Sequence, residues 1–185
     1  MTDAPLQRLI SAIDDITLAM PFEQIYQRLI PDFSASLLTP TWVQSCHRDT
    51  NETQGWTLHS LHQNSVNQLA LFLVSWLPQR GTPPHTHGTW GIIGGVEGVE
   101  TNIFWTRRDA GDKPGFADIH PAEEKACGPG DILILSADDI HSVENKSNTP
   151  TLSLHLYGVD PQMAERLAFD PQLQQVEVFT TQASR

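Results

Sequence analysis

The sequence predicts a mainly β domain with helices at its N-terminal end, and three observations lead to this fold class. Thirteen prolines and twelve glycines in 185 residues favour a fold rich in turns. Apolar residues at helical spacing occupy the first forty or so positions. From Trp56 onward, short β-type runs alternate with turn residues. We therefore expect an all-β core of the sandwich or barrel type, with the helices packed against it.

Two helices are expected before this core. Residues 2 to about 40 carry apolar side chains at the i, i+3, i+4 spacing of a helix face. The first series spans 6–16 and follows Asp3, a good N-cap residue. The second spans 22–30 and follows Pro21. Both helices are expected to support the core and to carry little chemistry.

Seven strands are expected in the core. They cover 56–62, 69–77, 90–96, 100–105, 131–135, 141–144 and 152–157. The segment 107–130 is rich in Gly, Asp, Pro and Lys, and its start, "RRDAGDKPG", predicts a surface turn. After Tyr157, "VDPQMAERLAF" predicts a short helix that begins at Asp160 and Pro161. A last strand at 176–180 and a polar tail complete the chain.

The composition excludes several classes of partner. With 39% hydrophobic and 18% charged residues, the chain fits one globular domain. Its formal charge of −11 would repel phosphate backbones and anionic lipid, so neither nucleic acid nor a membrane is expected to bind it. The apolar stretch 69–77 is too short to span a bilayer, and no export signal is apparent. Since Cys46 and Cys127 allow at most one disulfide, we expect a cytoplasmic protein.

The candidate chemistry begins with histidines. His85 and His87 are separated by one residue, so on a strand both imidazoles point to the same face. His141 follows later and can join them if its strand lies beside theirs, which gives one ion three neutral imidazole ligands. An HxH pair among eight histidines also arises by chance. The residues around these histidines therefore decide between a metal site and a chance pair.

That pattern resembles the cupin superfamily, whose members fold as double-stranded β-helix (jelly-roll) barrels. The first cupin motif, G-x5-HxH-x3,4-E-x6-G, is matched at the two histidines and Gly98. The second, G-x5-PxG-x2-H-x3-N, is matched at Gly130, His141 and Asn145. The sequence departs from both motifs: Gly91 replaces the glutamate ligand, and Gly81, Ser136 and Asp138 do not fit the pattern. The resemblance implies a single cupin domain over 1–185, with a helical segment at 1–45, a barrel core at 56–160 and an extension at 161–185.

The loss of the glutamate has a chemical consequence. Three neutral ligands leave a divalent ion with its full charge and about three open positions on one face. Such a site favours an anionic chelating substrate. A thiolate with a second donor group, together with dioxygen, suits these positions, which is the layout for oxidation of sulfur by iron.

The strand 152–157 adds a polar row. Ser153, His155 and Tyr157 alternate and therefore lie on one face, where Ser can orient His and His can orient the Tyr hydroxyl. A strand whose polar groups are satisfied by their neighbours is an equally good interpretation of these three residues. His155 is also an alternative metal ligand.

Three segments together resemble the thiol dioxygenases, a family that includes cysteine dioxygenase and 3-mercaptopropionate dioxygenase. They are "PPHTHGTWGIIGGVEGVE", "GDILILSADDIHSVEN" and "SLHLYG". The resemblance spans roughly 59–169. It implies that His85, His87 and His141 bind Fe²⁺ and that Ser153, His155 and Tyr157 form the outer triad. Animal-type cysteine dioxygenases crosslink a cysteine near the HxH motif to the tyrosine. Neither cysteine of this chain lies there, so no crosslink is expected.

The candidate substrate-binding residues are arginines and one histidine. The arginine that precedes the first motif in cysteine dioxygenases is absent, whereas the mercaptopropionate branch carries an arginine after the tyrosine, and Arg166 follows Tyr157 by nine residues. A guanidinium fork suits a carboxylate, although an exposed helical arginine paired with Glu165 or Asp170 is the structural alternative. Further candidates are Arg80, His62 and Arg48. Glu97 and Glu100 are expected on a solvated strand face, and Trp76 and Trp90 in the core.

The sequence thus predicts a cytoplasmic oxidoreductase, an iron-dependent thiol dioxygenase that converts a small thiol and O2 into the sulfinate. Two alternatives remain at this stage. One is a three-histidine metal cupin that cleaves a diketone-type substrate, and the other is a metal- or ligand-binding cupin without enzymatic activity. The expected assembly is a monomer or a small homo-oligomer.

Overall fold

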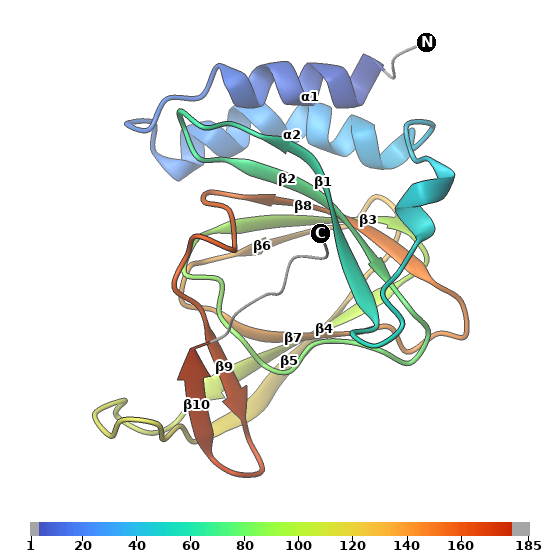
Figure 1. Ribbon diagram of the computed structural model, residues 1–185. Helices are drawn as coiled ribbons and strands as arrows, with labels where there is room; N and C mark the ends of the chain where they lie inside the picture. The colour runs from blue at the N-terminus through green and yellow to red at the C-terminus, as the bar shows by residue number, and fades with distance from the viewer. Residues whose placement is uncertain (1–3, 179–185) are drawn as a thin grey trace.

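The chain passes from helices into strands in the predicted order (Figure 1). The computed structural model describes residues 4–178, so the predicted cap at Asp3 lies outside the described residues. Helix α1 covers Ala4–Asp14 and α2 covers Phe22–Leu38, and a 3-10 turn, η1, covers Ser45–Arg48. None of the described helices is both long and apolar enough to cross a membrane.

Two antiparallel sheets face each other as the walls of a barrel (Figure 1). The larger sheet has the order β1-β2-β8-β3-β6, the smaller β5-β4-β7, and β9 and β10 form a separate hairpin. This arrangement confirms the predicted mainly β, jelly-roll barrel with N-terminal helices. The strands are β1 (Trp56–Gln63), β2 (Ala70–Trp76), β3 (Gly91–Glu97), β4 (Glu100–Arg107), β5 (Ile119–Cys127), β6 (Ile132–Leu135), β7 (Ile140–Glu144), β8 (Thr151–Tyr157), β9 (Leu167–Asp170) and β10 (Gln175–Val178).

The two helices cover the outer face of the larger sheet (Figure 1). Leu9 of α1 and Leu29 of α2 are fully buried against leucines of β2 and β8, as their helical spacing predicts. Gly94 lets α2 come close, because a Cβ at this position would lie within 2.7 Å of Leu37 and Phe33. The opposite face of the same sheet is thereby left to the barrel interior.

Two elements differ from the sequence-based expectation. The turn predicted at the start of segment 107–130 is present, but it is followed by β5, a strand that was not predicted and that pairs with β4 along its whole length. Glutamates and a lysine of β5 point to solvent at this sheet edge and hide the strand from a search for apolar runs. The helix predicted after Tyr157 is absent: turns around Pro161 lead directly into β9. The final strand is present as β10, and its predicted end at Thr180 lies outside the described residues.

Candidate metal centre

His85, His87 and His141 meet inside the barrel. Antiparallel backbone pairing places His85 opposite His141: the amide of His85 donates to the carbonyl of His141 at 2.8 Å, and the reverse bond measures 3.0 Å. All three side chains are buried, and one ring nitrogen of each lies within 4.8 Å of the other two. The loop before β3 thus supplies His85 and His87, and β7 supplies His141, which follows His87 by 54 residues in the sequence.

Hydrogen bonds orient these rings for metal binding. Nδ1 of His85 lies 2.9 Å from the carbonyl oxygen of Pro83, and Nδ1 of His141 lies 3.0 Å from Oδ1 of Asn102. Since oxygen accepts in both bonds, Nδ1 carries the proton and Nε2 carries the lone pair.

The His87 ring shows that a cation fits between these nitrogens. Its Nε2 lies 2.8 Å from Nε2 of His141, and its buried Nδ1 has no hydrogen-bond partner among residues 4–178. Two nitrogens that bind one ion at about 2.0–2.1 Å and at a right angle are about 3 Å apart. The donor set therefore fits a divalent ion of the kind that imidazole prefers.

Burial keeps the three rings neutral. It lowers the pKa of His85 to about 4 and lowers the pKa values of His87 and His141 well below their usual range. The positive charge of Arg166 lowers the pKa of His85 and His87 further. Since only neutral imidazole offers a lone pair, burial favours the metal-binding form.

Gly91 stands where the cupin motif has its glutamate, and the tyrosine fills the space. A Cβ at Gly91 would lie 3.2 Å from two carbons of the Tyr157 ring. The Tyr157 ring also packs against His87, with 4.8 Å between the ring centroids. A larger side chain at position 91 would push the tyrosine away, so the missing carboxylate and the position of Tyr157 belong together.

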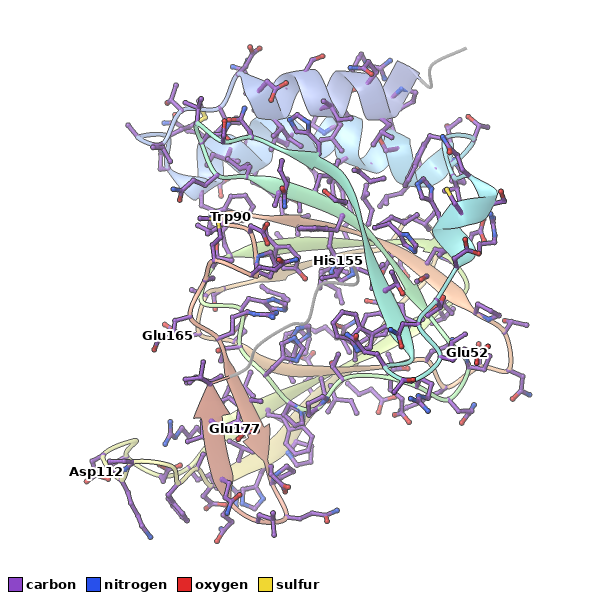
Figure 2. The ribbon with its side chains drawn as sticks, viewed as in Figure 1. Glu52, Trp90, Asp112, His155, Glu165 and Glu177 are labelled. Carbon is purple, nitrogen blue, oxygen red and sulfur yellow. The ribbon has the colours of Figure 1, made fainter. Side chains whose placement is uncertain are left out.

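The polar row on β8 forms a continuous chain of hydrogen bonds. Oγ of Ser153 lies 2.8 Å from Nε2 of His155, and Nδ1 of His155 lies 2.8 Å from the hydroxyl of Tyr157. Both nitrogens of His155 are thus occupied, which argues against the alternative that this residue binds the metal. The side chain of His155 lies inside the barrel beneath the larger sheet (Figure 2).

The central place of β8 explains the burial of the row, since β2 and β3 flank the strand on both sides. Burial lowers the pKa of His155 to about 3 and raises the pKa of Tyr157. The histidine ring and the phenol are therefore both neutral near pH 7.

Arg166 lines the same cavity as the three histidines, His155 and Tyr157. The residue is 4% exposed and precedes β9, so the alternative of an exposed helical arginine does not hold. Its backbone position is set by the loop of the HxH motif: the Thr86 amide donates to the Leu167 carbonyl at 2.9 Å. Gly88 has a φ of +63°, and a Cβ there would lie 2.1 Å from the Glu165 carbonyl oxygen.

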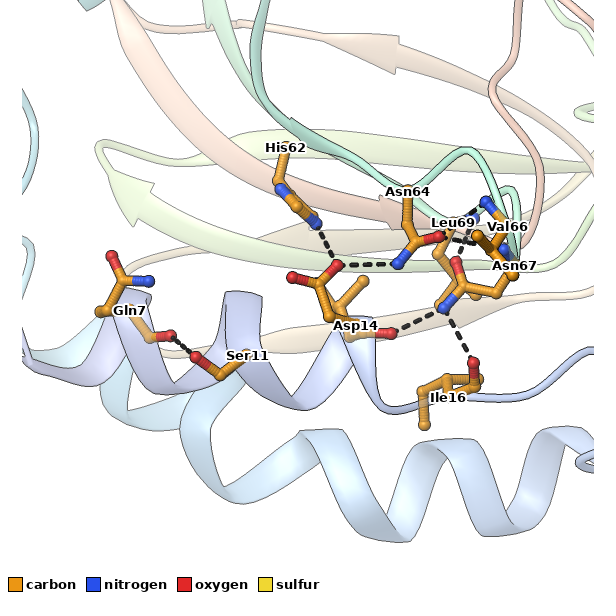
Figure 3. Close-up of polar contacts among 10 residues, drawn as sticks. Gln7, Ser11, Asp14, Ile16, His62, Asn64, Val66, Asn67 and Leu69 are labelled. Carbon is orange, nitrogen blue, oxygen red and sulfur yellow. Dashed lines mark hydrogen bonds and ion pairs between the residues drawn. The ribbon is translucent and has the colours of Figure 1, made fainter.

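The other predicted substrate residues lie away from this cavity. His62 faces the helices, where its Nε2 lies 2.7 Å from the Asp14 carboxylate (Figure 3). Arg80 is exposed and donates to the carbonyls of Glu52 and Thr53, and Arg48 pairs with Glu97. These three side chains bind protein groups at the surface and do not line the cavity around the three histidines.

Sequence reasoning missed the polar residues of β4. Glu100, expected on a solvated face, is 2% exposed, and its Oε1 accepts a hydrogen bond from Asn102 at 3.0 Å. Trp76 lines the cavity and donates from its indole to Ser153 at 3.2 Å, so it is more than a filler of the core. The sequence signal for the two polar residues of β4 was the two-residue periodicity of a strand, which places Glu100 and Asn102 on the same face.

Comparisons with known proteins give similarities at low identity. No protein-family model matches the chain. Oxalate oxidase in complex with glycolate aligns at 16% identity and a TM-score of 0.47, over 64% of this chain and 59% of the oxidase chain. A cupin-superfamily sugar phosphate isomerase from Silicibacter pomeroyi aligns at 16% and 0.45, over 69% and 77%. A Cupin_2 domain of a transcriptional regulator from Enterobacter cloacae aligns at 16% and 0.41, over 56% and 96%.

Proposed function

We propose that this protein is an iron-dependent thiol dioxygenase whose substrate is a small mercapto acid, 3-mercaptopropionate or a cysteine-like thiol. The reaction is R–SH + O2 → R–SO2H, in which both oxygen atoms are added to sulfur. One observation carries the proposal: three metal-binding histidines, the tyrosine of a buried Ser-His-Tyr row and a buried arginine all line one cavity.

The charges of the cavity select its ligand. The three metal ligands are neutral and Arg166 is cationic, so the cavity with a divalent ion is strongly positive. A ligand with a thiolate and a carboxylate supplies two negative charges. The thiolate suits the metal and the carboxylate suits the guanidinium fork.

The chain's own residues hold and shield the substrate. His85, His87 and His141 would hold Fe²⁺, which supplies the redox chemistry with dioxygen when it is bound. Arg166 binds and orients the carboxylate, and Tyr157 forms a hydrogen bond with the ligand. Trp56, Leu58 and Val74 belong to the apolar part of the cavity lining, which excludes water from the substrate.

The test is oxygen uptake by the Fe²⁺-loaded protein with a panel of compounds. The panel contains 3-mercaptopropionate, cysteine, 2-aminoethanethiol and a β-diketone. We expect one O2 consumed per sulfinate formed, with a mercapto acid as the best substrate. Uptake with the diketone alone would indicate the carbon–carbon cleaving alternative, and binding without uptake would indicate a ligand-binding cupin.

A pair of variants tests the role of Arg166. A bidentate arginine–carboxylate contact is worth a few kcal/mol, so Arg166→Ala should lower kcat/KM for 3-mercaptopropionate by on the order of tens- to hundreds-fold. The loss should be much smaller for 2-aminoethanethiol, which lacks a carboxylate. Arg166→Lys should restore part of the loss, since lysine keeps the charge without the fork.

Arg80→Ala is the matched control because Arg80 lies outside the cavity. It should leave the ratio of kcat/KM for the two thiols at the parent value. An unchanged ratio in Arg166→Ala would show that the carboxylate binds elsewhere.

A further inference from the structure

Glu100 is a buried carboxyl between the metal centre and the Ser153–His155–Tyr157 row. Its Oε1 accepts from Nδ2 of Asn102 at 3.0 Å, and Oδ1 of Asn102 accepts from Nδ1 of His141 at 3.0 Å. Its other neighbours are the Ser153 hydroxyl and the Trp76 indole, which favour its charged form against the burial that raises its pKa. The buried Oε2 has no hydrogen-bond partner among the described residues, so its lone pairs are available to the Ser153 proton.

The hydrogen bonds of Ser153 limit the direction in which each group of the row can donate its proton. Its hydroxyl has one proton and two lone pairs, and the Trp76 indole, which can only donate, takes one lone pair. One proton and one lone pair then remain for Glu100 and His155. If Glu100 accepts the Ser153 proton, Nε2 of His155 must donate to Ser153. Because burial keeps the His155 ring neutral, its Nδ1 is then bare and must accept the Tyr157 proton.

We propose that Glu100 is a positioning residue whose carboxylate sets the direction of these hydrogen bonds and takes up the thiol proton of the substrate through them. The proton moves in four transfers: from S–H to the Tyr157 oxygen, from Tyr157 to Nδ1 of His155, from Nε2 of His155 to Ser153, and from Ser153 to Oε2 of Glu100. The second and third follow hydrogen bonds of the row, and the fourth requires the Ser153 hydroxyl to turn to Oε2. Overall, R–SH and the carboxylate become R–S⁻ and the carboxylic acid. The proton transfer rests on the proposed function, whereas the direction of the bonds does not.

The surroundings of Glu100 suit this role. Asn102 cannot turn its amide, because its oxygen is held by His141, so it always donates to Glu100. Burial raises the pKa of Cys127 on β5 and of Tyr157, and the charge of Glu100 raises both further. Cys127, with a pKa of about 12, stays a neutral thiol and does not compete for the proton.

The first test reads the tautomer of His155 directly and needs no turnover. The full-length protein is labelled with ¹⁵N-histidine and loaded with diamagnetic Zn²⁺, and spectra are recorded at about pH 8, where carboxyl groups are normally ionised. The His155 signals are assigned by their loss in His155→Gln. We expect the proton on Nε2 in the parent protein. A proton on Nδ1 in the parent would overturn the inference without any further variant.

Glu100→Gln sharpens the comparison. The glutamine oxygen must face the fixed Asn102 donor, so its NH2 group donates to Ser153, and the His155 proton should move to Nδ1. Glu97→Gln removes the same charge from β3, where Glu97 pairs with Arg48, and should leave the tautomer of the parent. A shared tautomer in the parent and Glu100→Gln, or a switch in Glu97→Gln, would contradict the proposal.

The second test follows the proton. Calorimetric binding of 3-mercaptopropionate to the Zn²⁺-loaded protein, repeated in buffers of different ionisation enthalpy, counts the protons released per ligand. We expect about none from the parent, because Glu100 keeps the proton, and about one from Glu100→Gln. Equal release from both would overturn the proton transfer. Failure to bind any mercapto acid would count against the proposed function and leave the tautomer result standing.

Discussion

The two faces of strand β8 have different roles: one belongs to the structural core and the other to the candidate site. Leu152, Leu154 and Leu156 point to the helices and belong to the apolar cluster around α1 and α2. Their neighbours Ser153, His155 and Tyr157 point into the barrel and form the hydrogen-bonded row. All seven residues of the strand are buried to a similar degree.

The difference between the faces lies in how burial is compensated. On the helix face, apolar surface leaves water and stabilises the fold. On the barrel face, polar groups lose their hydration, and hydrogen bonds to neighbouring side chains must replace it. Burial therefore does not separate core from site in this chain. Substitutions on the two faces are expected to fail in different ways.

The largest effect is expected at the metal ligands. Replacing His85, His87 or His141 by Ala removes one of only three protein ligands, so the iron content should fall from about one per chain to a small fraction. Metal analysis after dialysis measures the loss. Circular dichroism should show that each variant stays folded. Stoichiometric iron in all three variants would remove these histidines as the ligand set.

Leu154→Ala tests the opposite face. Truncating a fully buried leucine costs about 2–5 kcal/mol of unfolding free energy, and denaturant titration measures this loss. The folded variant should retain its iron, because Leu154 contacts the helix side of the sheet. If the variant loses iron while it is folded, the two faces are coupled and the comparison fails.

The sequence predicted both faces of β8 because alternation within one strand is a local property. The two helices and the seven core strands that were predicted are present for the same reason, because helical spacing and turn residues mark them along the chain. The three histidines were found through their spacing, although their meeting depends on the pairing of His85 with His141.

What the sequence could not predict depends on contacts between distant segments. Glu100 looks like a solvated acid unless β5 and β7 are known to enclose β4 on both sides. The segment after Tyr157 has the composition of a helix, but pairing with the HxH loop draws it into β9. The charged edge strand β5 lacked the apolar alternation by which strands are found.

Tyr157→Phe separates binding of the metal from chemistry. The variant removes only the hydroxyl at the end of the row, so fold and iron content should stay at the parent level. A hydrogen bond to a charged group is worth about 1.5–3 kcal/mol, and the turnover number should therefore fall on the order of 10- to 100-fold. Steady-state oxygen uptake measures the change. His155→Ala should show a similar loss with iron retained, and loss of iron from both variants would make His155 a ligand.

Gly88→Ala tests how the HxH loop positions Arg166. The φ of +63° costs a non-glycine residue about 1–2 kcal/mol, and the new Cβ would meet the Glu165 carbonyl oxygen. Because Glu165 precedes Arg166, the guanidinium should be displaced, and KM for 3-mercaptopropionate should rise about tenfold with iron retained. For 2-aminoethanethiol, KM should change much less. Equal changes for both thiols would place the effect on the loop as a whole.

The smallest effect is expected at His62, a polar residue that belongs to the helix side. His62 and Asn64 hold the Asp14 carboxylate at the end of α1, and their hydrogen bonds lower the pKa of Asp14 (Figure 3). This contribution is present above the unfolded pKa of about 3.9 and is lost as the pH falls through the lower folded value. Since the Asp14 side chain is 47% exposed, His62→Ala should cost less than about 1 kcal/mol at neutral pH, and the difference from the parent should shrink in acid. Thermal unfolding between about pH 7 and pH 3 measures it, while kcat/KM for every thiol stays at the parent value. If His62→Ala changed the preference among the thiols, His62 would have to act in substrate binding. The two faces of the larger sheet would then not have separate roles.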